Sequence, residues 1–141
     1  MKNAIALMLL APGCVVYSYD VQDHPPVYVD NYAPILIDGY AGVFFDTTYG
    51  DDVWTFEATV DDPDGAFDIL GVWADVYDEY RGGVLVESFE LYPTDDPYFW
   101  YSDWLGSTTF LDPFYSGYTV DIVVYDQYES FDFITVWADT Y

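Results

Sequence analysis

The chain of 141 residues has almost no positive charge. Only Lys2 and Arg81 oppose 26 Asp and Glu residues, which gives a formal net charge of −24 at pH 7. Binding to nucleic acid or to an anionic membrane surface needs Lys and Arg side chains that displace counterions from phosphates. The composition therefore argues against nucleic acid as a partner and favours divalent cations or basic partners, although such charge also serves solubility alone.

Cysteine and histidine are each present once, as Cys14 and His24. The rest of the chain therefore has no disulfide, no ligand set for zinc and no base for a nucleophile–His–acid arrangement. No glycine-rich phosphate loop is present either. We expect a protein that is not an enzyme. A hydrolase that uses two Asp or Glu carboxylates stays open as an alternative, because acidic residues are abundant everywhere.

The N-terminal segment has the three parts of a secretory signal. Lys2 supplies the positive region, residues 4–10 are apolar, and Gly13 is a small residue before Cys14. The apolar run is too short to span a membrane as a helix. We predict a signal peptide over residues 1–13. Cys14 then either carries a lipid anchor or, as the alternative, is an incidental cysteine of a plain secreted protein.

The placement of Cys14 resembles a bacterial lipoprotein signal. This resemblance implies that Cys14 becomes the first residue of the mature protein and carries the lipid. It links Asp at the next position to retention at the inner membrane, and because that residue is Val15, we expect the outer membrane or cell surface. Residues 14–33 hold the Pro25-Pro26 pair and little periodicity, which predicts a semi-stiff tether. The folded domain is expected over residues 34–141.

Three segments of this domain alternate between apolar and other residues, which is the pattern of half-buried strands. Their inward residues are Trp54, Phe56, Ala58 and Val60; Leu70, Val72, Ala74 and Val76; and Tyr118, Val120, Ile122 and Val124. Further strands are expected over residues 34–38, 42–45, 84–92, 107–111 and 131–138. A tight turn is expected over 61–65 and a long connection over 93–106.

Seven or eight short strands without a helix predict an all-β, antiparallel sandwich. The Asn31-Tyr32-Ala33-Pro34 segment, the turn over 61–65 and the Gly117-Tyr118-Thr119-Val120 run resemble bacterial immunoglobulin-like, PKD-like and cadherin-like domains. The resemblance covers about residues 31–141. It implies that Tyr118 forms a tyrosine corner, in which the hydroxyl group bonds to nearby backbone.

Clustered aspartates make calcium the metal to consider. Calcium takes six to eight oxygen ligands, which Asp side chains and turn carbonyls supply. The candidate ligands are Asp61, Asp62 and Asp64, joined by Asp126 if the strand ends converge. The resemblance to cadherin-like domains implies the same, since acidic turns at the domain end bind calcium there. The alternative is a solvated turn without an ion.

The second candidate site is an acidic and aromatic sheet face. If segments 70–77, 118–125 and 131–138 are neighbours, their outward residues include Asp75 and Asp121 and five predicted contact residues: Trp73, Tyr77, Tyr125, Phe133 and Trp137. Such a face suits a carbohydrate or a protein partner. Alternatively, the rings pack beneath the connection over 93–106. The expected function is adhesion, envelope structure or protein–protein interaction by a surface lipoprotein, with carbohydrate binding as the alternative.

The lipid anchor has a direct test. Cys14→Ser removes the thiol that would carry the lipid, so we expect the variant to leave the membrane fraction, as measured by immunoblotting of fractionated cells. Membrane association equal to that of the wild type would refute the anchor.

Overall fold

The computed structural model of the chain describes residues 30–141, so the predicted signal peptide, Cys14 and His24 lie outside the described residues. The described part is all-β, and no helix in it is long and apolar enough to cross a membrane. Its seven strands are β1 (Ile35–Asp46), β2 (Asp51–Asp61), β3 (Ile69–Asp78), β4 (Val84–Pro93), β5 (Phe99–Leu105), β6 (Tyr118–Asp126) and β7 (Phe131–Trp137). Three single 3₁₀ turns connect them: η1 (Ala66–Asp68), η2 (Glu79–Arg81) and η3 (Gly106–Thr108).

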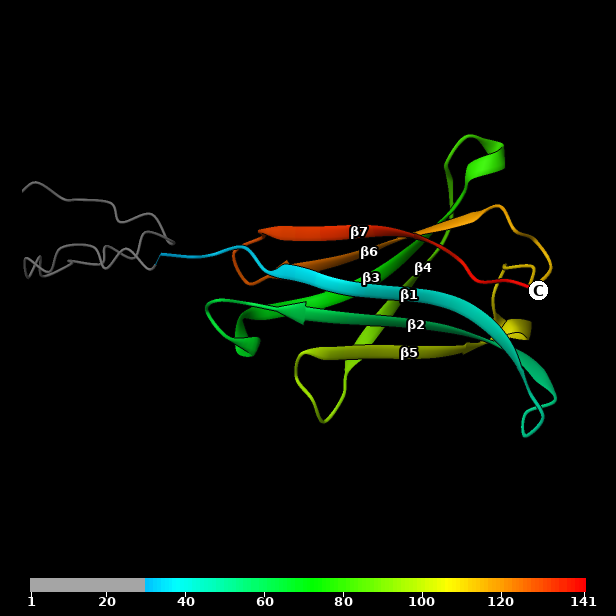
Figure 1. Cartoon of the computed structure of the whole chain (residues 1–141), viewed down its shortest axis with the longest axis horizontal. Helices are drawn as coiled ribbons and strands as arrows, with labels where there is room; N and C mark the ends of the chain where they lie inside the picture. The colour runs from blue at the N-terminus through cyan, green and yellow to red at the C-terminus, as the bar shows by residue number, and fades with distance from the viewer. Residues whose placement is uncertain (1–29) are drawn as a thin grey trace, which may run out of the picture.

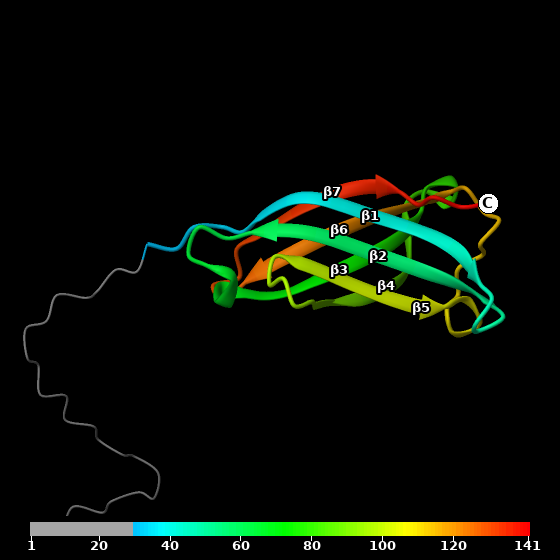
Figure 2. The same cartoon turned by 60° about the horizontal axis from the view of Figure 1, so that its bottom comes forward.

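The strands form an antiparallel, immunoglobulin-like sandwich, as the sequence predicts. Their hydrogen-bonded order is β1-β2-β5-β4-β3-β6-β7. The strand β4 pairs with β3 along most of its length and meets β5 only through Tyr92 and Pro93. The sheet therefore folds over at β4 into two layers, with β1, β2 and β5 in one and β3, β6 and β7 in the other (Figures 1 and 2).

The inward face of β2 confirms the predicted alternation. Trp54, Phe56 and Val60 are fully buried, and they pack in one core with Val72, Ala74 and Val76 of β3 and with Val120, Ile122 and Val124 of β6. Full burial of such a side chain contributes about 1.5–3 kcal/mol. The core therefore lies between the two layers, and it leaves the outward residues of β3, β6 and β7 free for other roles.

The two short strands expected around Gly39 are one long strand, β1, with a register shift between Leu36 and Asp38. Gly39 is not at a turn. A Cβ atom there would lie 2.8 Å from Cδ1 of Ile122 and 3.0 Å from Cγ2 of Ile134, so these side chains would have to shift. The glycine therefore lets β1 pass close over the opposite layer.

The predicted inward position of Leu70 is wrong. Leu70 is 63% exposed, and Ile69 is buried in its place. The cause is a register shift between Ile69 and Gly71 in the pairing of β3 with β6, because one extra residue in a strand turns the side chains before it to the other face.

The predicted connection over 93–106 is also wrong, since residues 99–105 form β5 and pair with β2. Trp100 and Ser102 are buried on its inward side. The strand predicted over 107–111 is instead the η3 turn followed by irregular chain. The first error comes from Pro and Asp residues that mark turns but here stand beside a short strand of aromatic residues, and the second from Thr and Phe residues that favour strands but here follow a turn.

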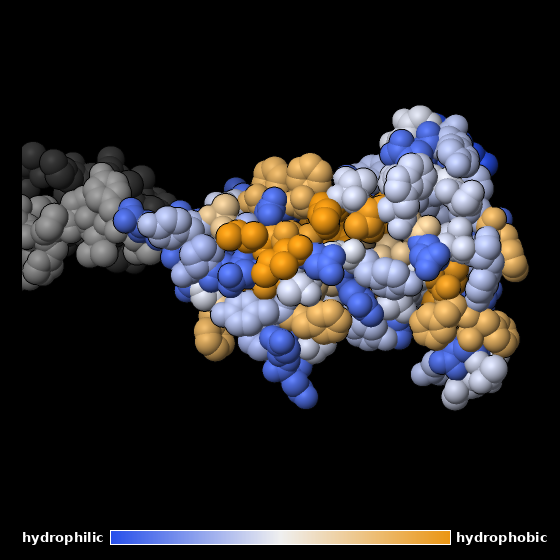
Figure 3. Space-filling model, viewed as in Figure 1, coloured by the Kyte–Doolittle hydropathy of each residue, from blue (hydrophilic) through white to orange (hydrophobic). Residues whose placement is uncertain are grey.

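The chain after β7 closes the gap between the first and last strands. The backbone N–H of Val43 donates to the carbonyl of Asp139, and the N–H of Asp139 donates to the carbonyl of Ala41, both at 2.9 Å. Gly42 and Asp139 thus form an isolated parallel bridge. Apolar side chains gather over this seam between β1 and β7 (Figure 3), where β1 carries the exposed Ile35 and Ile37.

The tyrosine corner is confirmed. The backbone N–H of Asp112 donates to the Tyr118 hydroxyl oxygen at 3.1 Å, and the ring is 6% exposed. The ring also lies edge-on to Trp54, with centroids 6.0 Å apart. Tyr118 therefore fixes the irregular chain before β6 against the core.

This contact predicts the effect of Tyr118→Phe. The variant keeps the ring and leaves the Asp112 N–H without its acceptor, which should lower the free energy of unfolding by about 1–3 kcal/mol. The truncation Tyr118→Ala also opens a cavity and should cost about 3–5 kcal/mol. Urea denaturation measures both values, and an unchanged midpoint in the two variants would contradict the corner.

Candidate functional site

The segment over residues 61–68 lies at the end of the sandwich where the described chain enters (Figure 1), and it contains four aspartates. After β2, the N–H of Gly65 donates to the carbonyl of Asp62 at 2.9 Å, and Gly65 has a positive φ of 105°. The η1 turn then brings Asp68 back toward the start of the loop. As a result, carboxylate oxygens of Asp62, Asp64 and Asp68 lie within 4.8 Å of one another.

Two further segments reach this group. The Asn31 side-chain amide donates to Asp126 at 2.8 Å, and the Tyr32 backbone N–H donates to Asp64 at 2.7 Å. Asp126 ends β6 and also accepts from the backbone N–H groups of Tyr128 and Ser130, both at 2.8 Å. We call Asn31, Asp62, Asp64, Asp68 and Asp126 the acidic pole.

Three buried oxygen atoms of the acidic pole have no hydrogen-bond donor: Oδ1 of Asn31, Oδ2 of Asp62 and Oδ2 of Asp68. The Asp62 side chain is 97% buried, because Asp62 is 3% exposed. A buried oxygen without a partner is costly unless a donor or a cation faces it. Asn31, Asp64 and Asp68 line one surface hollow, which gives solvent and ions access to the group. The residues therefore fit a hard cation with oxygen ligands.

The electrostatics of the acidic pole agree with this fit. Burial, together with the neighbouring carboxylates, raises the pKa of both Asp62 and Asp68. Burial acts in the same direction on Asp126, but hydrogen bonds from Asn31, Ser130 and Tyr128 outweigh it and lower the pKa of that carboxyl. Negative charge is thus stabilised by donors at Asp126, only partly at Asp62, whose Oδ1 accepts from the Asp64 N–H at 2.8 Å, and not at Oδ2 of Asp62 or Oδ2 of Asp68.

The structure brings two of the four predicted ligands, Asp62 and Asp64, together with Asp68. Asp126 is near enough for its charge to raise the pKa of Asp62 and Asp68, but both of its oxygens accept hydrogen bonds from other groups. Asp61 is exposed, because alternation along β2 turns it to the face opposite the buried Val60. Asp68 and Asn31 were not predicted as ligands. The η1 turn that returns Asp68 spans one turn only, and Asn31 lies 95 residues before its partner Asp126.

Comparisons with known proteins do not assign the chain to a family. No family model, curated protein or solved structure matches it. The resemblance to PKD-like and cadherin-like domains therefore stays a prediction that rests on the quoted sequence segments.

The strands of the predicted acidic and aromatic sheet face are neighbours, as the sequence analysis assumes. β3, β6 and β7 are adjacent, and their outward side chains lie on one surface, which we call the aromatic face. Trp137 is 60% exposed, Phe133 54% and Tyr125 37%, while Trp73 and Tyr77 are half-buried. Trp73 lies across Gly71, where a Cβ atom would meet its ring at 2.5 Å, and stands edge-on to Tyr125.

The alternative in which the 93–106 segment covers these rings is wrong. β5 pairs with β2 in the other layer, so its Trp100 and Trp104 pack against the core from that side. The aromatic face is therefore open among the described residues, and its rings are available for contact.

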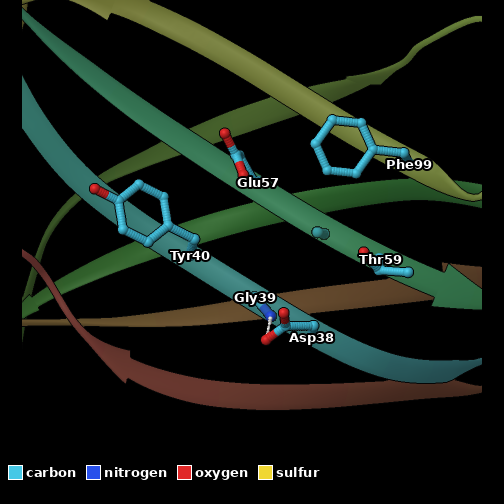
Figure 4. Close-up of a pocket in the computed structure, with 7 residues that line it drawn as sticks. Asp38, Gly39, Tyr40, Glu57, Thr59 and Phe99 are labelled. Atoms are coloured by element: carbon cyan, nitrogen blue, oxygen red, sulfur yellow. Dashed lines mark hydrogen bonds between the residues drawn. The ribbon is translucent and has the colours of Figure 1, made fainter.

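The opposite outer face has a shallow hollow over β1, β2 and β5. Tyr40, Glu57 and Phe99 surround it, with Asp38 and Thr59 at its edge (Figure 4). Burial, with Asp139 and Glu57 nearby, raises the pKa of Tyr40. No predicted site residue lies there.

The raised pKa values of Asp62 and Asp68 predict the pH dependence of the metal-free domain. An acid whose pKa is raised by folding destabilises the native state above that pKa, and the penalty is lost as the pH falls through it toward the ordinary value near about 3.9. The lowered pKa of Asp126 acts only below that range. In a chelator, the urea midpoint should therefore rise on acidification from neutral pH. Asp62→Asn should reduce this rise, whereas the exposed Asp95→Asn should not, and equal slopes in both variants would contradict the assignment.

Proposed function

We propose that this protein is a non-enzymatic, calcium-binding interaction module displayed at the cell envelope, where it acts in adhesion, envelope structure or protein–protein contact. The observation that carries the proposal is the acidic pole, with three buried oxygen atoms that lack any donor. The location at the cell envelope rests on the predicted signal peptide and the predicted lipid at Cys14, which lie outside the described residues.

Calcium suits the acidic pole better than other metals. All its side chains offer oxygen, and the single Cys and His of the chain come before residue 30. Calcium accepts six to eight oxygens in flexible geometry, whereas magnesium demands a near-ideal octahedron and keeps several waters. Oδ1 of Asn31 and carboxylate oxygens of Asp62, Asp64 and Asp68, with water through the open hollow, would provide such a set.

A calcium ion here would join the domain to the chain that precedes it. Asn31 and Tyr32 already bond to Asp126 and Asp64, and Pro34 is fully buried beside them. Without a cation, the repulsion among Asp62, Asp64 and Asp68 works against these contacts. The ion would therefore hold the tether in a fixed direction as it enters the sandwich, which suits a domain that must project from a surface.

Carbohydrate binding is the second candidate, and the aromatic face favours it. Tyr125, Phe133 and Trp137 are exposed on adjacent strands, and rings of this kind stack on sugar faces while carboxylates bond to hydroxyl groups. A glycan array with the wild type and the Trp137→Ala variant tests this role. Binding of neutral glycans that the variant loses would support it.

The calcium proposal predicts a rise in melting temperature. Binding to the native state alone stabilises it by RT ln(1 + [Ca²⁺]/Kd), which is about 2.7 kcal/mol at 100 times Kd. Asp62→Asn and Asp68→Asn should each abolish most of this rise, and Asp95→Asn should keep it. Calorimetry in calcium and in chelator measures the difference. A wild-type melting temperature that is indifferent to millimolar calcium, a range that covers weak extracellular sites of about 10⁻³ M, would refute the proposal.

A further inference from the structure

The centre of the aromatic face holds two carboxylates directly opposite each other. Asp75 of β3 pairs in register with Asp121 of β6. The row continues outward on both sides, to Ser88 of β4 and to Thr135 of β7. Ser88 and Thr135 each donate a hydroxyl hydrogen bond of 2.6 Å, the first to Asp75 and the second to Asp121.

Like charges in direct cross-strand register destabilise a sheet. The two hydroxyl donors offset part of this repulsion, but no basic side chain among residues 30–141 does. The chain has only Lys2 and Arg81, and Arg81 is held by Asp78 at the end of β3, with Nε and Oδ2 3.3 Å apart. The negative charge of the Asp75–Asp121 pair is therefore not balanced by any basic side chain of the described residues.

Aromatic rings border this pair along the strand directions. Trp73 and Tyr77 are the next outward residues of β3, and Phe133 and Trp137 are the next outward residues of β7 around Thr135. Burial, together with Asp75 and Asp121, raises the pKa of the Tyr77 hydroxyl, so the phenol stays neutral beside them. Such a site can bind a cation through two interactions: the carboxylates attract its charge, and the ring faces form cation–π contacts with it.

We propose that the aromatic face binds a basic polypeptide segment, one of whose Arg or Lys side chains lies between Asp75 and Asp121. The inference rests on the proposed role as an interaction module and names its partner. A partner that covered this face without a cation would bury two facing carboxylates at high cost. A second copy of the chain cannot supply the charge, because it brings the same two basic residues and the same large negative charge.

The test uses a synthetic peptide of alternating Arg and Gly and isothermal titration calorimetry at about 150 mM salt, where long-range attraction is screened. Asp75→Asn with Asp121→Asn should weaken binding about tenfold or more, the factor typical of one lost charge-assisted contact. The control is Asp38→Asn with Asp95→Asn, which has the same net charge and lies off this face. It should bind like the wild type.

The face variant should also remain folded and melt up to about 5 °C higher, because the repulsion is gone. Its calcium-induced rise in melting temperature should persist, so that loss of peptide binding and loss of the calcium site are separate results. Three results would overturn the proposal: no peptide binding by the wild type, equal weakening in both double variants, or binding of neutral oligosaccharides in place of the peptide.

Discussion

Carboxylates in this domain are stabilised by hydroxyl and amide donors, because basic side chains are almost missing. Within residues 30–141 the one ion pair joins Arg81 to Asp78, and Asp78 also accepts from the Tyr115 hydroxyl at 2.6 Å, which raises the pKa of Tyr115 to about 12. Asp51 is similar, since hydrogen bonds from Ser107 lower its pKa. Because each such donor must come from a fixed place on a strand or turn, the acidic residues tie the loops to the sandwich. At the acidic pole, Oδ2 of Asp62 and Oδ2 of Asp68 are buried without such a donor.

Local alternation was enough to predict the core strands, and non-local contacts explain the errors. β2 and β6 bury each residue that their alternation predicts, because both lie in the middle of a layer with one face inward. The sequence predicts two short strands on either side of Gly39, since glycine often interrupts strands, whereas the glycine here makes room for Ile122 from the opposite layer. The face on which the Leu70 side chain lies depends on a register shift of β3 against β6, and no pattern within β3 predicts that shift.

The two candidate sites differ in how far the sequence could predict them. Period-two alternation, with β3, β6 and β7 as neighbours, predicts the aromatic face and places Trp73, Tyr125 and Trp137 on one surface. For the acidic pole, the turn chemistry of Pro63 and Gly65 indicated a cluster of aspartates. Asn31 and Asp68 could not be assigned, because their roles depend on where the N-terminal segment crosses the pole and on a single 3₁₀ turn.

The seam between β1 and the chain after β7 has a mechanical consequence. The described chain enters at one end of the long axis and ends at the other (Figure 1), and the bridge between Gly42 and Asp139 is parallel. A pulling force between the two ends would slide these segments past each other along their length. The hydrogen bonds of Val43 and Asp139 would then share the load with the β1–β2 ladder, rather than break one after another. This arrangement resists extension along the line that joins the two ends of the described chain.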